Sequence, residues 1–207
     1  MTHTLHRQGS EENLKNDFVV LAKAANGINE KGAAEKLQQF LRMALRHKAV
    51  NIGHGRVGNM YAVDPERIIA TIPDNAGATV VFDDQDELQS FIKELKDADL
   101  GISIVISSLF KTSMECCKKA GIVPHTIEHS LGIWGKTEKL APKEVLEVTT
   151  MCGHGLISAH LVTSLVEDLK KGRTTAEAAS KELAKQCACG ILNPVRAAQL
   201  LEGMAEK

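Results

Sequence analysis

The residues best suited to chemistry lie in the last third of the chain, in two short cysteine clusters. One is MCGHG at residues 151–155, and the other is CACG at residues 187–190. Thiolates and imidazoles are common ligands of zinc and of iron–sulfur clusters. We predict that the two clusters meet in space, so that Cys152, Cys187 and Cys189 hold a metal centre.

Several interpretations of these cysteines are open. Three thiolates suit a 4Fe–4S cluster that leaves one iron free for a substrate or for His154. They also suit zinc with His154 as the fourth ligand, a closed Cys3His structural site. The flanking glycines let the backbone approach a bulky inorganic group. The C-x-C spacing is less usual in such sites. A catalytic thiol without metal and buried cysteines that only pack remain alternatives.

A second candidate site is the sequence HTIEH, which begins at His125 and matches the H-x-x-E-H pattern of inverted zinc peptidases. On a helix, His125 and His129 would share one face and bind zinc, while Glu128 activates water. Pro124 and Gly132 leave little room for that helix, so extended chain is favoured. The two histidines are therefore candidates for proton transfer, ligand binding or simple packing.

Four further residues are candidates for binding an anionic small-molecule substrate, by residue type alone: His6, Arg7, Ser107 and Ser108. Ser107 and Ser108 end a predicted strand, and ligands often bind at the carboxyl ends of strands in α/β sheets. A G-x-G-x-x-G match at residues 53–58 is interpreted as a flexible turn. A predicted helix precedes it and no long helix follows, whereas a nucleotide-binding loop needs a strand before and a helix after.

The hydrophobic pattern predicts the elements that must position these residues. Residues 78–107 have the strand–helix–strand order of a βαβ-like unit. From Pro142 onward the chain reads as almost entirely helical, and Asn193-Pro194 is a strong start signal for the last helix. Strands are expected at residues 2–8, 18–22, 67–72, 78–82 and 101–107, and helices from residue 33, at 84–97 and from about 175 to 186.

These elements predict an α/β or α+β fold. A mixed sheet with flanking helices should occupy residues 1–140 as a candidate ligand-binding portion. A helical portion, residues 141–207, should pack on it and carry the cysteine site. Cys116 and Cys117 are adjacent within a predicted helix, where their side chains diverge, so we interpret them as structural.

The amino-acid composition argues against several classes of function. The chain is 43% hydrophobic but only 3% aromatic, and its formal net charge is −1 with both signs interspersed. Neither stacked aromatics nor a basic block for nucleic acid or an anionic membrane is present. No apolar run approaches the roughly 20 residues that span a bilayer. No signal-peptide pattern begins the chain, so we expect a cytoplasmic protein. There, five cysteines favour metal ligation or chemistry over disulfides.

The sequence thus predicts a metal- or iron–sulfur-binding protein. The favoured form is a 4Fe–4S enzyme of lyase type, a dehydratase or desulfurase, acting on a small polar substrate with His154, His125 or His129 moving protons. One alternative is a non-enzymatic metal-binding or redox-sensing module with structural Cys3His zinc. A second is an H-x-x-E-H metal-dependent hydrolase. A homo-oligomer is compatible with either the enzyme or the module.

Overall fold

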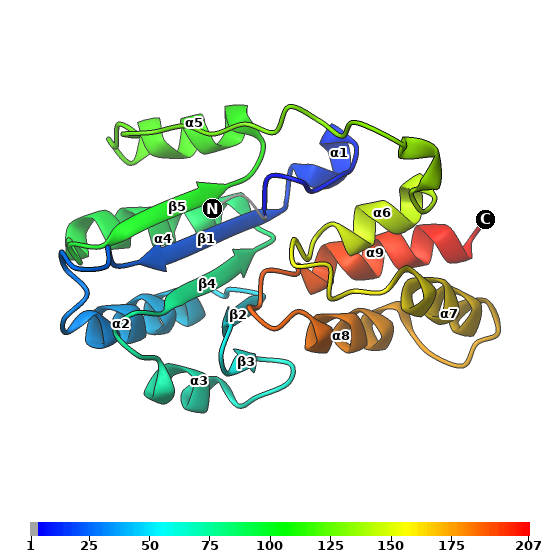
Figure 1. Cartoon of the computed structure of the whole chain (residues 1–207), viewed down its shortest axis with the longest axis horizontal. Coiled ribbons are helices and arrows are strands. Elements are labelled where there is room, and N and C mark those ends of the chain that lie inside the picture. Colours follow the sequence, from blue (N-terminus) through cyan, green and yellow to red (C-terminus); the bar gives the residue numbers. More distant parts are fainter. Residues whose placement is uncertain (1–3) are drawn as a thin grey trace.

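The protein is built around one five-stranded sheet. A computed structural model of the chain, in which residues 4–207 are described, places the strands in the order β3-β2-β4-β1-β5 (Figure 1). Every neighbouring pair is antiparallel, which confirms the α+β prediction and replaces the expected mixed sheet. The strands are β1 Phe18–Lys23, β2 Asn51–His54, β3 Gly58–Asn59, β4 Gly77–Phe82 and β5 Ser103–Ser107.

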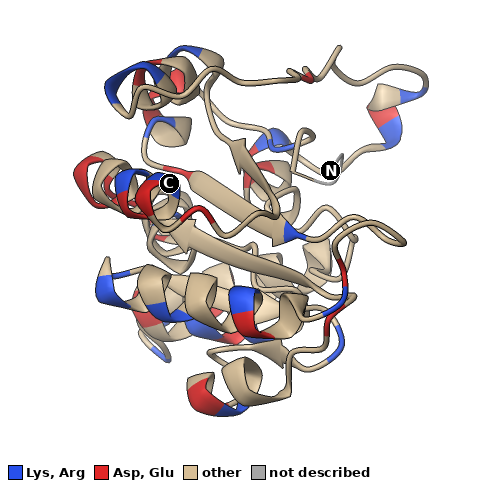
Figure 2. Cartoon of the chain, turned by 90° about the vertical axis from the view of Figure 1, so that its left-hand side faces the viewer, with Lys and Arg blue, Asp and Glu red and all other residues tan. Residues whose placement is uncertain are grey.

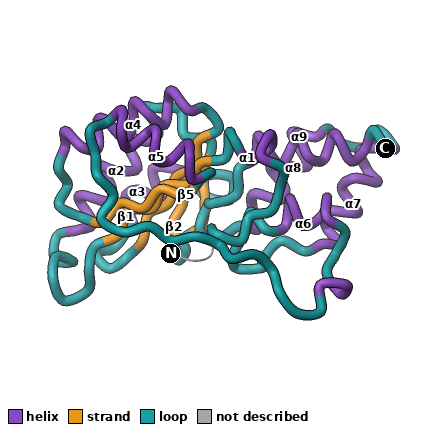
Figure 3. The backbone as a smooth tube through the Cα atoms, turned by 90° about the horizontal axis from the view of Figure 1, so that it is seen from above, coloured by secondary structure: helices purple, strands orange, loops and turns teal. Residues whose placement is uncertain are grey.

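The helices fall into two groups. Figure 3 shows α2, α3, α4 and α5 beside the sheet, and α6 to α9 gathered at one end of it. None of the helices in residues 4–207 has the length and apolar character to cross a membrane. The helices are α1 Glu11–Leu14, α2 Ala33–Arg46, α3 Pro65–Thr71, α4 Gln85–Ala98, α5 Phe110–Lys119, the 3-10 turn η1 Thr137–Lys139, α6 Lys143–Thr149, α7 Ala159–Lys170, α8 Ala176–Gln186 and α9 Pro194–Ala205.

The two faces of the sheet belong to two hydrophobic cores. Side chains alternate between faces along a strand. In β1, Phe18 and Val20 enter a core shared with α2 and α4. Val19 and its pairing partner Val81 of β4 enter a second core, shared with α6 to α9. The helical portion is therefore fixed to the sheet by apolar side chains from β1 and β4.

The predicted strand–helix–strand unit is present in a split form. β4 and β5 both run antiparallel to β1, so they are parallel to each other with β1 between them. Helix α4 connects them, and its N-cap Asp84 accepts hydrogen bonds from the Asp86 and Glu87 amides. This arrangement carries the chain from one side of β1 to the other.

The prediction of a strand at residues 67–72 is wrong. Helix α3 covers most of it, because Asp64 caps the helix through the Glu66 and Arg67 amides and Pro65 supplies the first turn. The β-branched Ile68 and Ile69 suggested a strand, but in the helix both are fully buried. Local capping overrides the weak β-propensity here.

Two other N-terminal expectations also need correction. The strand expected at residues 2–8 is not formed in its described part, where residues 4–6 make a turn and residues 7–10 have no regular structure. The glycine-rich stretch at residues 53–58 does contain a turn, at residues 55–57, but a strand and not a helix stands directly before it. It is a β-hairpin of β2 and β3, with Gly53 opposite Asn59 and His54 opposite Gly58.

Gly53 brings the sheet into direct backbone contact with the second cysteine cluster. A Cβ atom added at Gly53 would lie 2.7 Å from the Cys189 carbonyl oxygen. One added at Gly190 would lie 2.9 Å from the Cα of Gly53, and Gly190 also has a φ of +77°. Only glycine fits on both sides of this contact.

We therefore expect Gly53→Ala and Gly190→Ala each to lower the free energy of unfolding by about 1–3 kcal/mol, the usual cost of overpacking. Urea denaturation monitored by circular dichroism measures this. Gly203→Ala in α9 is the matched control, since a Cβ there meets nothing within 4 Å. It should leave stability unchanged or raise it. Equal stabilities of all three variants would contradict the contact.

Candidate metal centre

The three cysteines of the candidate site come from two loops at the end of the sheet. The first loop follows α6 and carries Cys152. The second is the turn between α8 and α9, where the Gly190 amide donates to the Cys187 carbonyl at 2.9 Å. Thr175 caps α8 and Asn193 caps α9, as the sequence predicted. Helix ends thus fix both loops.

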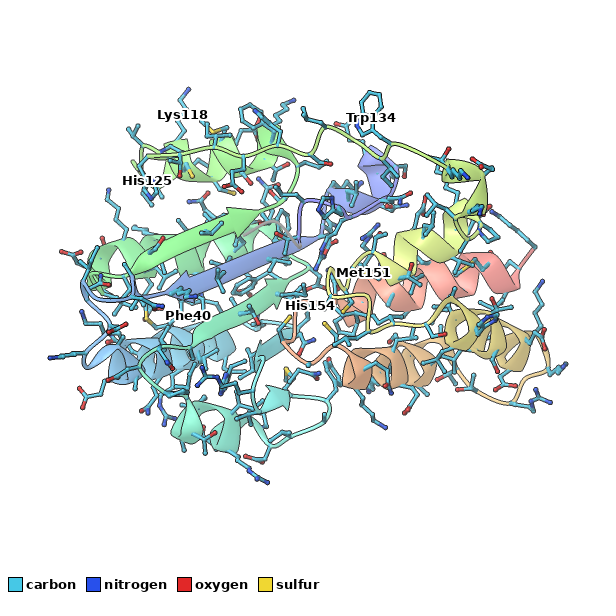
Figure 4. The ribbon with its side chains drawn as sticks, viewed as in Figure 1. Phe40, Lys118, His125, Trp134, Met151 and His154 are labelled. Carbon is cyan, nitrogen blue, oxygen red and sulfur yellow. The ribbon has the colours of Figure 1, made fainter. Side chains whose placement is uncertain are left out.

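The two loops meet, as predicted. The Cys187 thiol is hydrogen-bonded to both Cys152 and Cys189. All three are free thiols, and their residues are only 2%, 0% and 7% exposed in the order Cys152, Cys187 and Cys189. His154 lies on the solvent side, with its Nδ1 3.7 Å from the Cys189 sulfur. Figure 4 places Met151 and His154 at the junction between the sheet and the C-terminal helices.

Four carbonyl groups of the second loop are bound by side chains of the N-terminal portion. Asn59 donates to the Cys187 carbonyl at 2.8 Å, and Asn51 donates to the Leu192 carbonyl at 3.0 Å. The side chain of Thr79 binds the Cys189 carbonyl, and that of Arg7 binds the Ile191 carbonyl. The sheet and the N-terminal segment therefore hold this loop by its carbonyl oxygens.

Several backbone amides of the two loops face the sulfur atoms. The Leu192 amide interacts with the Cys187 sulfur, and the Ile191 amide interacts with the Cys189 sulfur. In the first loop, the Leu156 amide interacts with the Cys152 sulfur, as does the His154 amide. Hydrogen-bond donors around a sulfur favour its thiolate form, which is the form that binds metals.

The three thiols differ in acidity. The hydrogen bond to Cys187 and burial raise the pKa of Cys152 strongly. Cys187 donates to one neighbour and accepts from the other. Its bond to Cys152 lowers its pKa, but the bond to Cys189 and burial outweigh this and raise the pKa to about 11. The bond from Cys187 lowers the pKa of Cys189 despite burial. The first thiolate therefore forms on the side of His154.

Arg7, a predicted substrate ligand, lies in the framework of the site. Its side chain is 8% exposed and forms an ion pair with Asp17. Its guanidinium also donates to the Ile191 carbonyl and, at 3.3 Å, to the Met151 carbonyl. Arg7 thus connects the two cysteine loops to each other.

Asp17 holds this framework together. Its carboxylate pairs with Arg7 on one side and, at 2.9 Å, with Arg196 of α9 on the other. The Asn193 side chain donates to it as well. Burial acts to raise the pKa of Asp17, but the two guanidinium groups outweigh it and lower the pKa. Asp17 is therefore ionised at neutral pH.

The other predicted substrate ligands do not join the cysteine site. His6 lies in an exposed turn. The Ser107 hydroxyl bonds to that of Thr4 at 2.8 Å, and the Ser108 hydroxyl bonds to that of Ser113 at 2.6 Å.

The histidines of the H-x-x-E-H sequence lie in an exposed loop between α5 and η1, not on a helix. The His129 ring lies 5.6 Å from that of Phe110. The His125 ring accepts or donates a hydrogen bond with Thr126 at 3.0 Å. In Figure 4, His125 and His154 lie at widely separated places. The structure therefore does not bring the two predicted sites together.

Sequence reasoning missed the residues that hold the second loop. Asn51, Asn59 and Thr79 are 0%, 0% and 3% exposed, and each lies in a strand. A buried polar side chain in a strand needs a hydrogen-bond partner, so Asn51 and Asn59 beside apolar neighbours were the available signal. Their partners are more than 100 positions away and could not be read from spacing.

The candidate metal ligands lie near one another but do not surround a common point. Within residues 4–207, no three His, Cys, Asp or Glu side chains already stand in a metal-coordinating arrangement. The thiols would have to lose their protons and turn toward a common centre. Comparison with known proteins finds no matching family model, no matching curated protein and no matching solved structure.

We expect Asp17→Asn to lower the free energy of unfolding by about 3–5 kcal/mol at pH 7, because it leaves two buried guanidinium groups without a full counter-charge. Urea unfolding of this variant measures the loss. Asp86→Asn on the exposed start of α4 is the control and should cost less than about 0.5 kcal/mol.

The difference in the free energy of unfolding between wild type and Asp17→Asn should depend on pH. The folded-state pKa of Asp17 lies below its ordinary value. Its stabilising effect is therefore complete above about pH 4 and is lost as the pH falls toward the folded pKa. The difference between wild type and Asp17→Asn should shrink below pH 4. A constant difference down to pH 2 would contradict this assignment.

Proposed function

We propose that Cys152, Cys187 and Cys189 hold a 4Fe–4S cluster. The observation that supports this best is the convergence of three buried thiols in loops whose backbone amides face the sulfur atoms. Three protein thiolates leave one iron of such a cluster without a protein sulfur.

The surroundings of the thiols fit an inorganic group that is open on one side. Gly153, His154, Gly155 and Leu156 are exposed beside Cys152, while the opposite side is closed by the sheet and α9. Gly155 and Gly190 both have positive φ angles, +68° and +77°, so the two loops turn tightly around the sulfur atoms. Substrate access would be from the His154 side.

The activity we propose is that of a lyase, a dehydratase or desulfurase, on a small polar substrate. When bound, the cluster would supply a Lewis-acidic iron to a hydroxyl or thiol leaving group. We assign to His154 the movement of a proton at this opening, and the 3.7 Å distance between its Nδ1 and the Cys189 sulfur supports that role. A reducing cytoplasm is the compartment that suits five free thiols.

A structural zinc site is the second candidate. The proximity of His154 to Cys189 supports this candidate, because His154 could serve as the fourth ligand beside the three neighbouring thiols once they turn toward a common centre. Tetrahedral zinc brings its ligands closer together than an iron–sulfur cluster does. The protein would then be a metal-binding module without catalysis.

Metal and acid-labile sulfide content of protein purified without oxygen tests both candidates. We expect about four iron and four sulfide per chain with broad visible absorption. Cys152→Ala and Cys187→Ala should each abolish that absorption. Cys116→Ala and Cys117→Ala are matched controls, since Cys116 belongs to the other core, and both should retain the metal.

Each other outcome has a definite meaning. About one zinc per chain, lost in Cys152→Ala and in His154→Ala, would assign the structural module instead. Metal that survives Cys152→Ala would place it elsewhere. Folded protein that takes up neither iron nor zinc on reconstitution would overturn the metal centre.

A further inference from the structure

The turn of the β2–β3 hairpin lies beside the second cysteine loop. Residues 55–57 form this turn, and the hairpin lies beside α8 in Figure 1. A Cβ atom added at Gly55 would lie 3.9 Å from the Cβ of Cys189, which is ordinary van der Waals contact. Consecutive Cα atoms are about 3.8 Å apart, so Arg56 follows at the border of the same opening. The tertiary structure thus brings an arginine next to the candidate metal centre.

Arg56 supplies the only full charge in the three loops that border the opening. These loops are the hairpin turn at residues 55–57, the first cysteine loop at 150–158 and the second at 187–193. Apart from Arg56, they contain no Lys, Arg, Asp or Glu, and His154 is their single histidine. A single sign of charge at an opening attracts ions of the other sign. The loops therefore favour the approach of an anion over that of a cation.

Arg56 also lacks the carboxylate partner that most arginines of this protein have. Figure 2 shows Lys and Arg interspersed with Asp and Glu along the helices it presents. Among the exposed arginines, three form ion pairs: Arg42 with Glu66, Arg46 with Glu94 and Arg173 with Asp168. Within residues 4–207, no carboxylate pairs with Arg56 or with Arg67 of α3, and both are exposed. Arg67 lies outside the three loops, so Arg56 is the unpaired arginine at the opening.

The present partner of the Arg56 guanidinium is a neutral group. The guanidinium donates to the side-chain oxygen of Asn75 at 3.3 Å, and both residues are exposed. A carboxylate accepts two parallel N–H bonds from a guanidinium, and such charge-assisted bonds are roughly twice as strong as neutral ones. A carboxylate ligand would therefore displace Asn75 from Arg56. Because the arginine side chain lies at the surface, it can turn without disturbing the core.

We propose that the substrate of this site is a small carboxylic acid and that Arg56 binds its carboxylate. The hydroxyl or thiol leaving group of the substrate would then face the cysteines and His154. One arginine suits a singly charged carboxylate, whereas a phosphate group carries nearly two charges and more acceptor oxygens. The reaction assigned to this substrate rests on the proposed function, but binding of a carboxylate at Arg56 needs no metal. Arg56 thus takes the role predicted for Arg7, which belongs to the Asp17 framework.

Alkylation of Cys189 in the metal-free protein tests the proposal without an enzyme assay. Iodoacetate carries a carboxylate and iodoacetamide does not, and with both reagents the cysteine sulfur displaces iodide. Tandem mass spectrometry measures the two rates at Cys189. At low ionic strength, Arg56→Gln should lower the ratio of the iodoacetate rate to the iodoacetamide rate about three- to fivefold, as expected for one surface charge pair. Salt at about 0.5 M should remove most of this difference.

Two further variants serve as controls. Arg67→Gln removes the other unpaired arginine and should leave the ratio unchanged. Arg56→Lys keeps the positive charge and should have a ratio close to that of wild type. The rate with iodoacetamide alone should be the same in all variants, which shows that the structure around Cys189 is unchanged.

Equal ratios in wild type and Arg56→Gln would overturn the proposal, as would an equal fall in Arg67→Gln. A Cys189 that neither reagent alkylates in the folded protein would do the same, because no small substrate could then enter. Protection of Cys189 from iodoacetamide by inorganic phosphate but not by acetate would assign a phosphate in place of the carboxylate. The metal is measured separately: an Arg56-dependent ratio in protein that takes up no iron would retain the carboxylate site and reject the cluster.

Discussion

The buried carboxylate of Asp17 is the group on which the arrangement of the molecule depends. It stands just before strand β1 and pairs with Arg7 and Arg196, from opposite ends of the chain. Glu147 of α6 adds a second negative charge near Arg196, so the buried groups are balanced. A charge buried without partners is very costly, and this requirement fixes the N-terminal segment, the sheet and α9 relative to one another.

The two cysteine loops are held in position by that framework, because Arg7 binds a carbonyl group in each of them. The sheet binds three carbonyl groups of the second loop, those of Leu192, Cys187 and Cys189, through Asn51, Asn59 and Thr79. Two amides from other peptide groups of this loop, those of Leu192 and Ile191, face the sulfur atoms of Cys187 and Cys189. The same loop therefore docks the helical portion on the sheet through its carbonyl groups and supplies hydrogen-bond donors to the thiols through different amide groups. The candidate site is a product of the junction and belongs to neither portion alone.

The sequence by itself determined the elements whose signals are local. Period-2 and period-3.6 patterns located β1, β4, β5, α2 and α4, and side-chain caps located the starts of α8 and α9. The residue types also identified Cys152, Cys187 and Cys189 as candidate metal ligands. Only the tertiary structure decided that α3 is helical, that Gly53 touches Gly190, and that Arg7 connects the two loops. These features depend on partners far apart in the chain, and a hydrogen bond or close contact across such a separation leaves no periodic signal in the sequence.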